Sequence, residues 1–259
     1  MKLTLWLFAL AYAGLAQTGP ISKLDHSAWG RVLAQYESRE ARVDYGALKS
    51  HGSPDLQEYL RQLAGPWPKS LTLNERKAAL IDAYNALTVN WIVQNYPVPS
   101  IWRTSHPFTE ARHEVDGRKV SLEQIETELR NMGDPRIHAA LVCASISCPP
   151  LRREAYVPEQ LERQLDDNVR SWLKNPELTR FDPANRKAEV SMIFDWYKSD
   201  FEKNGSSVLL FLSRFAPVVT EPGFKLTYRN YNWGLNDTSN IGANYSKASF
   251  YKDYLRNKL

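Results

Sequence analysis

Apolar residues recur every three or four positions along much of the chain, a spacing that predicts amphipathic helices. Residues 24–37 show it clearly, with Leu24, Trp29, Val32 and Tyr36 near one face. Residues 78–93 differ because they are apolar nearly all round, which predicts a central, buried helix. Helices are predicted over residues 24–37, 54–65, 72–97, 121–131, 157–175 and 206–216.

Polar residues and prolines mark the ends of several of these helices. Thr72 with Glu75 and Ser121 with Gln124 have the spacing of capping boxes, which predicts two helix starts. Pro158 is expected to start the helix over 157–175. Gly65, followed at once by a proline, is a typical helix stop.

The remaining segments predict a few short strands. Residues 113–121 form a predicted hairpin around Asp116 and Gly117, and 42–49 a short extended segment and turn. The continuous apolar run over 138–143 is expected to be a buried strand. A strand leading into a helix is expected over 187–201, and a late strand over 225–237. Helices and strands do not alternate, so the predicted class is α+β: a helix-rich single domain around a small, mostly antiparallel sheet.

The first 16 residues have the pattern of a secretory signal peptide. Lys2 precedes an apolar run over 3–12, which small residues follow up to Ala16. The run is far short of the roughly 20 residues that span a bilayer, and no membrane anchor is expected. The predicted organisation is a signal peptide over 1–16, a globular domain over 17–237 and a C-terminal extension over 238–259, in a secreted or periplasmic protein.

Charge gives no sign of a nucleic-acid partner. The chain has 33 Lys and Arg against 29 Asp and Glu, and the net charge of +4 is spread along it rather than clustered. The 8 Trp, 13 Tyr and 9 Phe residues suit either a stable core or a groove that binds sugars or peptides. The partner therefore stays an unidentified peptide or protein, and no cofactor is expected.

The segment over 136–152, "RIHAALVCASISCPPLR", holds both cysteines of the chain. In a straight strand His138 and Cys143 would lie on opposite faces, so His138 is expected to pair with a residue from elsewhere, such as Cys148 after the turn. A Cys143–Cys148 disulfide is an alternative, and it requires the intervening chain to fold back on itself.

The catalytic interpretation makes Cys148 a nucleophile and His138 its base, with Asn85 or Asp195 orienting the imidazole. Arg152 or Arg153 could lower the thiol pKa. The residues expected to bind substrate and shape the pocket are Tyr84, Arg152, Cys143, Ser145 and Ser147. A zinc site using His138 and both cysteines, with His106 or His113, fits no common ligand spacing, and no metal is predicted.

Five stretches together resemble one known family, the domain of unknown function 547. The resemblance extends from about residue 25 to about 237, and its specific motifs are "CASISCP" over 143–149 and "DAYN" over 82–85. At the first polar position of the helix motif this chain has Asp82, where many members have asparagine. The stretches are "VDYGALK" (43–49), "DAYNALTV" (82–89), "HAALVCASISCPPLRREAY" (138–156), "SMIFDWYKSDF" (191–201) and "YNWGLND" (231–237).

The resemblance implies that these polar motifs converge in one place, but it carries no established activity. A helix-packed sheet that bears a Cys and a His is also similar to papain-like and transglutaminase-like folds. Two functions are therefore expected as alternatives. One is thiol-dependent acyl transfer to, or hydrolysis of, a peptide or amide. The other is a binding or scaffolding domain with structural cysteines.

Overall fold

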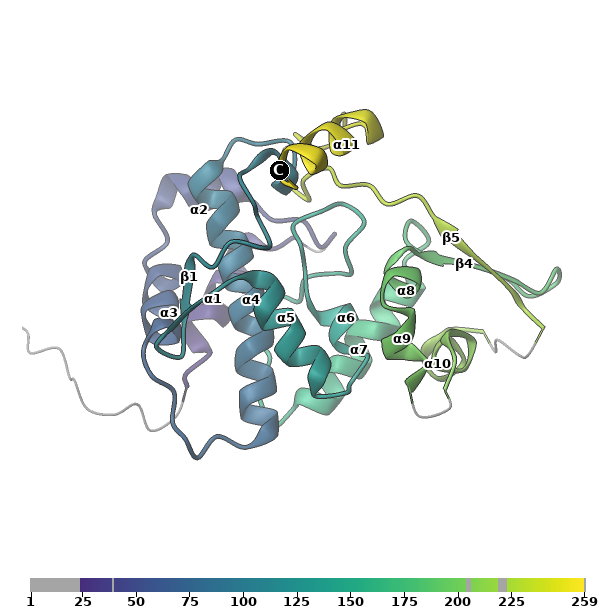
Figure 1. Cartoon of the computed structure of the whole chain (residues 1–259), viewed down its shortest axis with the longest axis horizontal. Coiled ribbons are helices and arrows are strands. Elements are labelled where there is room, and N and C mark those ends of the chain that lie inside the picture. The colour runs from purple at the N-terminus through teal and green to yellow at the C-terminus, as the bar shows by residue number, and fades with distance from the viewer. Residues whose placement is uncertain (1–23, 39, 204–205, 219–222, 259) are drawn as a thin grey trace, which may run out of the picture.

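The computed structural model describes residues 24–38, 40–203, 206–218 and 223–258 (Figure 1). The predicted signal peptide over 1–16 lies outside the described residues. Helices dominate and the strands are short, which confirms the α+β class. None of the helices in the described ranges is long and apolar enough to cross a membrane.

The first half of the chain is built around one central helix. This helix, α4 (Leu73–Asn95), is buried on nearly all sides and begins with the predicted capping box of Thr72 and Glu75. Helices α2 (Tyr45–His51), α3 (Pro54–Ala64) and α5 (Leu122–Asn131) pack directly on α4 (Figure 1). Helix α1 (Ser27–Tyr36) and the hairpin of β1 (His113–Val115) and β2 (Arg118–Val120) pack on α3.

The second half packs a smaller apolar cluster against α7. Side chains of α7 (Leu161–Lys174) meet those of α8 (Ile193–Trp196), α9 (Lys198–Phe201) and α10 (Val208–Phe215). Three short strands join this cluster and extend outward in Figure 1. β3 (Arg180–Asp182) pairs antiparallel with β4 (Lys187–Ser191), which pairs in parallel with β5 (Lys225–Arg229).

The buried strand predicted over 138–143 is wrong. Residues Ile137–Ala140 form the short helix α6, and irregular chain follows from Leu141. Two buried amides take the place of a neighbouring strand as hydrogen-bond partners. Asn85 of α4 donates to Ala140 O (2.9 Å) and accepts from Val142 N (2.9 Å), while Asn168 of α7 donates to Ala139 O. The run is apolar because both halves of the core cover it, not because it belongs to a sheet.

The extended segment and turn predicted over 42–49 is a helix from Tyr45 onward. Asp44 caps this helix, α2, by accepting a hydrogen bond from Ala47 N (2.8 Å). Gly52, with φ of 64°, closes its C-terminal end. The aspartate therefore acts as a helix cap rather than as a turn residue.

Two more boundaries differ from the sequence prediction. α7 begins at Leu161, because Pro158 lies in the turn that precedes it. The late strand ends at Arg229, and residues 230–237 continue as irregular chain with isolated bridges from Leu235 to Ser145 and from Asp237 to Val43.

The helix α11 (Lys247–Arg256) was not predicted. It contacts the short 3₁₀ turn η1 (Ile101–Arg103), where Asp253 pairs with Arg103 (3.0 Å).

Candidate active site

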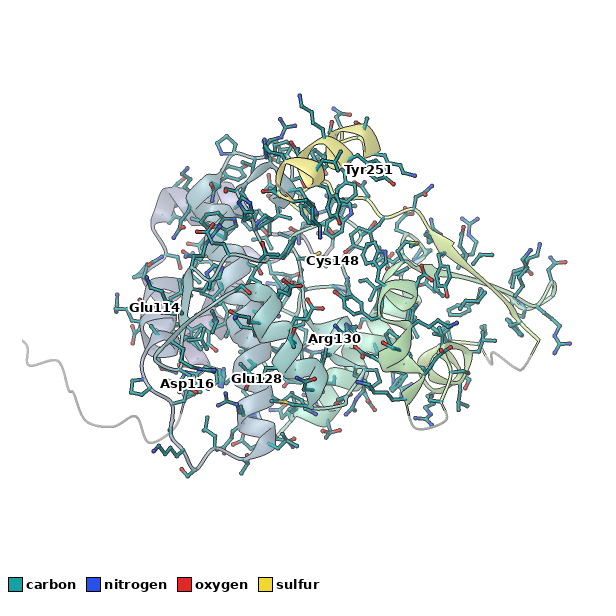
Figure 2. All side chains as sticks on the ribbon, in the orientation of Figure 1. Glu114, Asp116, Glu128, Arg130, Cys148 and Tyr251 are labelled. Atoms are coloured by element: carbon teal, nitrogen blue, oxygen red, sulfur yellow. The ribbon has the colours of Figure 1, made fainter. Side chains whose placement is uncertain are left out.

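A cavity of about 1010 Å³ lies where the two halves of the core meet α11. Figure 2 shows Cys148 beneath α11 in this central region, with Arg130 projecting from α5. Both cysteines, His138 and Tyr84 line the cavity, so Tyr84 meets residues that lie 54 or more positions further along the chain. Aromatic rings form much of its wall, including Trp196, Tyr197, Tyr231, Trp233, Phe250 and Tyr254.

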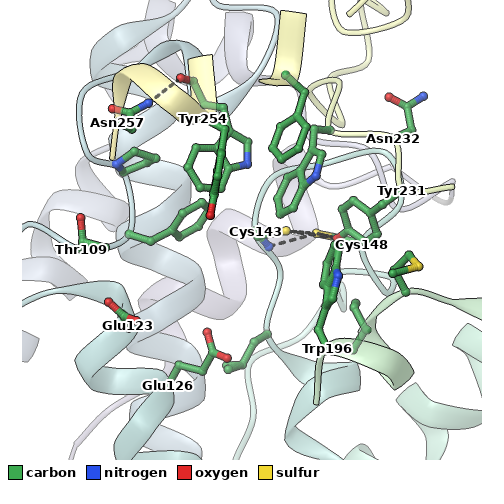
Figure 3. Close-up of a pocket in the computed structure, with 18 of the residues that line it drawn as sticks. Thr109, Glu123, Glu126, Cys143, Cys148, Trp196, Tyr231, Asn232, Tyr254 and Asn257 are labelled. Atoms are coloured by element: carbon green, nitrogen blue, oxygen red, sulfur yellow. Dashed lines mark hydrogen bonds between the residues drawn. The ribbon is translucent and has the colours of Figure 1, made fainter. Parts of the chain in front are cut away.

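The two thiols come together because the chain folds back between them. Ala144 takes a left-handed conformation, with φ of 58°, and Cys148 N donates to Ser145 O (3.1 Å) in a tight turn. The Sγ atoms of Cys143 and Cys148 lie 2.7 Å apart (Figure 3), and both cysteines are free. A disulfide bond measures about 2.05 Å, so the sulfurs are adjacent without being bonded.

A distant segment holds this turn in place. Ile146 N donates to Gly234 O (2.8 Å), and Ser147 N donates to Asn232 O (3.2 Å). The Ser147 hydroxyl accepts a hydrogen bond from Asn232 N (2.9 Å), so it anchors the backbone. At Gly234 the chain passes so close to Gly242 that a Cβ would lie 2.1 Å from its carbonyl oxygen. Only glycine fits at this position.

The Cys148 sulfur accepts hydrogen bonds from several donors. Cys143 N donates to it (3.1 Å), and so does the Tyr231 hydroxyl (3.4 Å), while the Ser145 hydroxyl lies 3.2 Å away as a third donor. The amide N–H of Cys143 can only donate, so a negative charge on the two sulfurs is most stable on Cys148. The Cys143 thiol then donates a hydrogen bond to the Cys148 sulfur.

These contacts determine which thiol ionises. Burial disfavours the Cys148 thiolate, but hydrogen bonds from Cys143, Ser145 and Tyr231 outweigh burial and lower the pKa of Cys148 to about 6. Burial and the neighbouring Cys148 sulfur raise the pKa of Cys143 well above its usual value. Cys148 is therefore the nucleophilic sulfur near neutral pH, and Cys143 stays protonated.

His138 has an acidic partner that differs from both predicted ones. Its Nε2 lies 2.9 Å from Oδ2 of Asp200 in α9, and its ring stacks on Tyr197 with centroids 4.1 Å apart. Hydrogen bonds from His138, Arg130 and Lys203 hold the pKa of Asp200 well below its usual value, although burial opposes them. The ionised carboxylate accepts the Nε2 proton, which leaves Nδ1 as the basic ring nitrogen.

The residues predicted to orient His138 lie elsewhere. Asn85 holds the backbone on either side of Leu141, just before Cys143, and so positions the thiol segment. Asp195 is exposed on α8. Arg152 donates to Gln164 O (3.2 Å) and pairs with Glu154, and in the described part of the chain it is not among the residues lining the cavity. Within these described residues, no hydrogen bond joins His138 to either sulfur.

Sequence reasoning assigned no role to several residues at this site. Tyr231 and Asp200 both lie in the sequence motifs quoted above. Asp200 is three residues after Tyr197, so its carboxylate lies near the Tyr197 ring, which stacks on His138. In Figure 3, Glu123 and Glu126 of α5 lie on the wall opposite Trp196 and Tyr231. No group of three or more His, Cys, Asp or Glu side chains among the described residues could hold a metal ion.

Residues 68–173 match the family model described as "Protein of unknown function, DUF547". The chain contains a DUF547 domain. The match includes Asn85, His138 and both cysteines, and ends within α7. Asp200 and Tyr231 lie beyond the matched range of the DUF547 domain, yet they contact its imidazole and its thiols. No curated protein and no solved structure matches this chain.

Proposed function

We propose that this protein is a thiol-dependent enzyme that transfers or hydrolyses the acyl group of a peptide or amide. The observation that carries the proposal is the stabilised thiolate of Cys148 in the same cavity as the His138–Asp200 pair. A nucleophile with a lowered pKa and a histidine oriented by a carboxylate are the two parts that acyl transfer needs.

Cys148, His138 and Asp200 each have a separate role in the proposed reaction. Cys148 Sγ attacks the substrate carbonyl carbon, and the amide C–N bond breaks to leave a thioester. Nδ1 of His138 donates a proton to the departing amine, and it then accepts a proton from the water or amine that attacks the thioester. Asp200 keeps the imidazole oriented through Nε2.

Tyr84 and the aromatic wall supply the binding surface. Tyr84 lines the cavity, and burial raises the pKa of its hydroxyl well above 10, so it remains a neutral donor for a developing oxyanion. Trp196 and Trp233 stack with centroids 5.8 Å apart, and Trp233 stacks on Phe250 at 5.4 Å. This continuous aromatic surface suits an extended substrate with apolar or planar groups, such as a peptide.

Action outside the cytoplasm is part of the same proposal. It is supported by the leader pattern over residues 1–16, in which one lysine precedes an apolar run and small residues follow. The substrate would then be a peptide or protein of that compartment.

The test is to trap the acyl-enzyme. The reduced full chain is treated with p-nitrophenyl acetate, release of p-nitrophenolate is followed, and the acetyl group is located by intact mass and peptide mapping. We expect a burst with one acetyl group on Cys148. Cys143→Ser keeps the burst, since serine also donates a hydrogen bond to Cys148, whereas Cys148→Ser removes it. His138→Ala slows turnover by about 10²- to 10⁴-fold.

Scattered acetylation that is the same in wild type and Cys148→Ser would overturn the proposal. Circular dichroism and Tm of each variant show whether it is folded. Folded protein with an unreactive Cys148 would support a binding domain with structural cysteines instead.

A further inference from the structure

Acyl transfer at Cys148 leaves one feature of the site unused, the second sulfur. One thiolate and one imidazole are sufficient for that reaction, yet the Cys143 sulfur lies 2.7 Å from that of Cys148. The fold imposes this approach through the left-handed Ala144, the turn at Ser145 and the pairing with residues 232–236. A sub-ångström movement would bring the sulfurs to bonding distance.

We propose that Cys148 and Cys143 form a reversible dithiol–disulfide pair that exchanges with low-molecular-weight disulfides entering the cavity. This activity goes beyond acyl transfer and does not depend on it. The co-reactant is an organic disulfide, RS–SR′.

The exchange takes two steps. The Cys148 thiolate attacks one sulfur of RS–SR′, the S–S bond breaks, and R′S⁻ leaves with the electron pair. Cys143 then attacks the Cys148 sulfur of this mixed disulfide and expels RS⁻, and its own proton passes to a departing thiolate. The two cysteines lose two electrons, and the disulfide is reduced to one thiol and one thiolate, which takes its proton from water.

The first step also prepares Cys143 for the second. After burial, the largest causes of its raised pKa are the hydrogen bond and the negative charge shared with Cys148. Both disappear once Cys148 is capped, and the Ser145 and Tyr231 hydroxyls, which lie 3.5 and 3.3 Å from the Cys143 sulfur, can then donate to its thiolate. The resolving thiol is therefore activated only when there is a mixed disulfide to resolve.

Access favours a small disulfide over a folded protein. The Cys148 side chain is 5 % exposed and Cys143 is half-buried, and both are reached through the cavity.

The pair also has a regulatory consequence, which rests on the proposed acyl transfer. Because Cys148 would serve both reactions, a Cys143–Cys148 bond suspends acyl transfer until it is reduced.

The test uses oxidised glutathione and the reduced full chain, without oxygen. Wild type is expected to lose two hydrogens by intact mass, to release two glutathione thiols per protein and to keep no adduct. Cys143→Ser releases one thiol and retains glutathione on Cys148. Cys148→Ser is expected to react at least about tenfold more slowly, because burial still raises the pKa of Cys143 when the Cys148 thiolate is absent.

Wild type that retains the same glutathione adduct as Cys143→Ser, or that releases no thiol, would overturn the proposal. The thiol count of wild type alone decides this, even if a variant fails to fold. Failure of acyl transfer is seen separately, as absence of the acetyl burst in the reduced wild type. The two proposals can therefore fail independently.

Discussion

The two chemical groups of the cavity are held in different ways. On one side, Asp200 bonds to His138, to Arg130 Nε (2.6 Å) and to Lys203 (3.2 Å), so charged partners fix the carboxylate. On the other side, Cys148 is surrounded by neutral donors, a thiol, a hydroxyl and an amide. The charged partners of Asp200 fix the orientation of His138. The neutral donors around Cys148 allow its sulfur to change charge, proton or bonding partner with little rearrangement of the site.

This contrast gives each side a distinct role. A histidine that must point in one direction for every turnover needs a rigid partner. A sulfur that is in turn thiolate, thioester and disulfide needs partners that tolerate each form. Variants on the two sides should therefore change different measurements.

The largest effect is expected from Asp200→Asn. The amide removes the charge that holds the Nε2 proton, and acyl transfer should fall by about 10²- to 10⁴-fold. Alkylation of Cys148 by iodoacetamide should change little, because its donors are intact. Steady-state turnover of p-nitrophenyl acetate and alkylation rate are measured on the same preparation.

Asp195→Asn is the matched control, since this exposed aspartate lies on the preceding helix. Equal losses in the two variants would mean that Asp200 does not act through His138. A parallel loss of alkylation in Asp200→Asn would mean that the two sides of the cavity are not independent.

A smaller effect, on stability, is expected from Asn85→Leu. The change leaves Ala140 O and Val142 N unpaired in the core, at a cost of about 2–4 kcal/mol. Tm should fall by roughly 5–15 °C. Asn90→Ala on the same helix removes a half-buried amide that contacts Gln57, and should cost only about 0.5 kcal/mol. Thermal unfolding of the two variants tests the difference, and equal Tm values would contradict it.

The smallest effect is expected from Gly234→Ala. Its Cβ would overlap Gly242 O, and the overpacking costs about 1–3 kcal/mol, a fall in Tm of roughly 3–10 °C. The shift of residues 232–236 should also weaken the Tyr231 hydrogen bond and slow alkylation of Cys148. Gly30→Ala is the opposite control, because nothing lies within 4 Å of the new Cβ in the middle of α1. It should raise Tm slightly, and a fall like that of Gly234→Ala would refute the steric explanation.

Local patterns were enough to predict much of the fold. The capping boxes at Thr72 and Ser121 and the hairpin at Asp116–Gly117 depend on residues within a few positions of one another, and the structure has all three. The segment over 138–143 could not be predicted this way. Its hydrogen-bond partners, Asn85 and Asn168, come from distant helices, and a short apolar run looks the same in a strand and in a buried helix.

The site shows the same limit. Cys148 and His138 could be proposed from residue type and from their place in one segment, and they line one cavity. Asp200 and Tyr231 could not be assigned, because 62 and 83 positions separate them from the groups that they contact. Only tertiary packing brings such residues together.

The most direct test of the central idea is the pH dependence of alkylation. Iodoacetamide reacts with the thiolate, so the rate at Cys148 in the reduced protein should rise to half its maximum at a pH of about 6. At pH 7 the rate should exceed that of an unperturbed cysteine, with its pKa of about 8.5, by up to about 30-fold. Cys148→Ser should lose this phase. A single rise near pH 8.5, equal in wild type and Cys148→Ser, would contradict the account of a stabilised Cys148 thiolate.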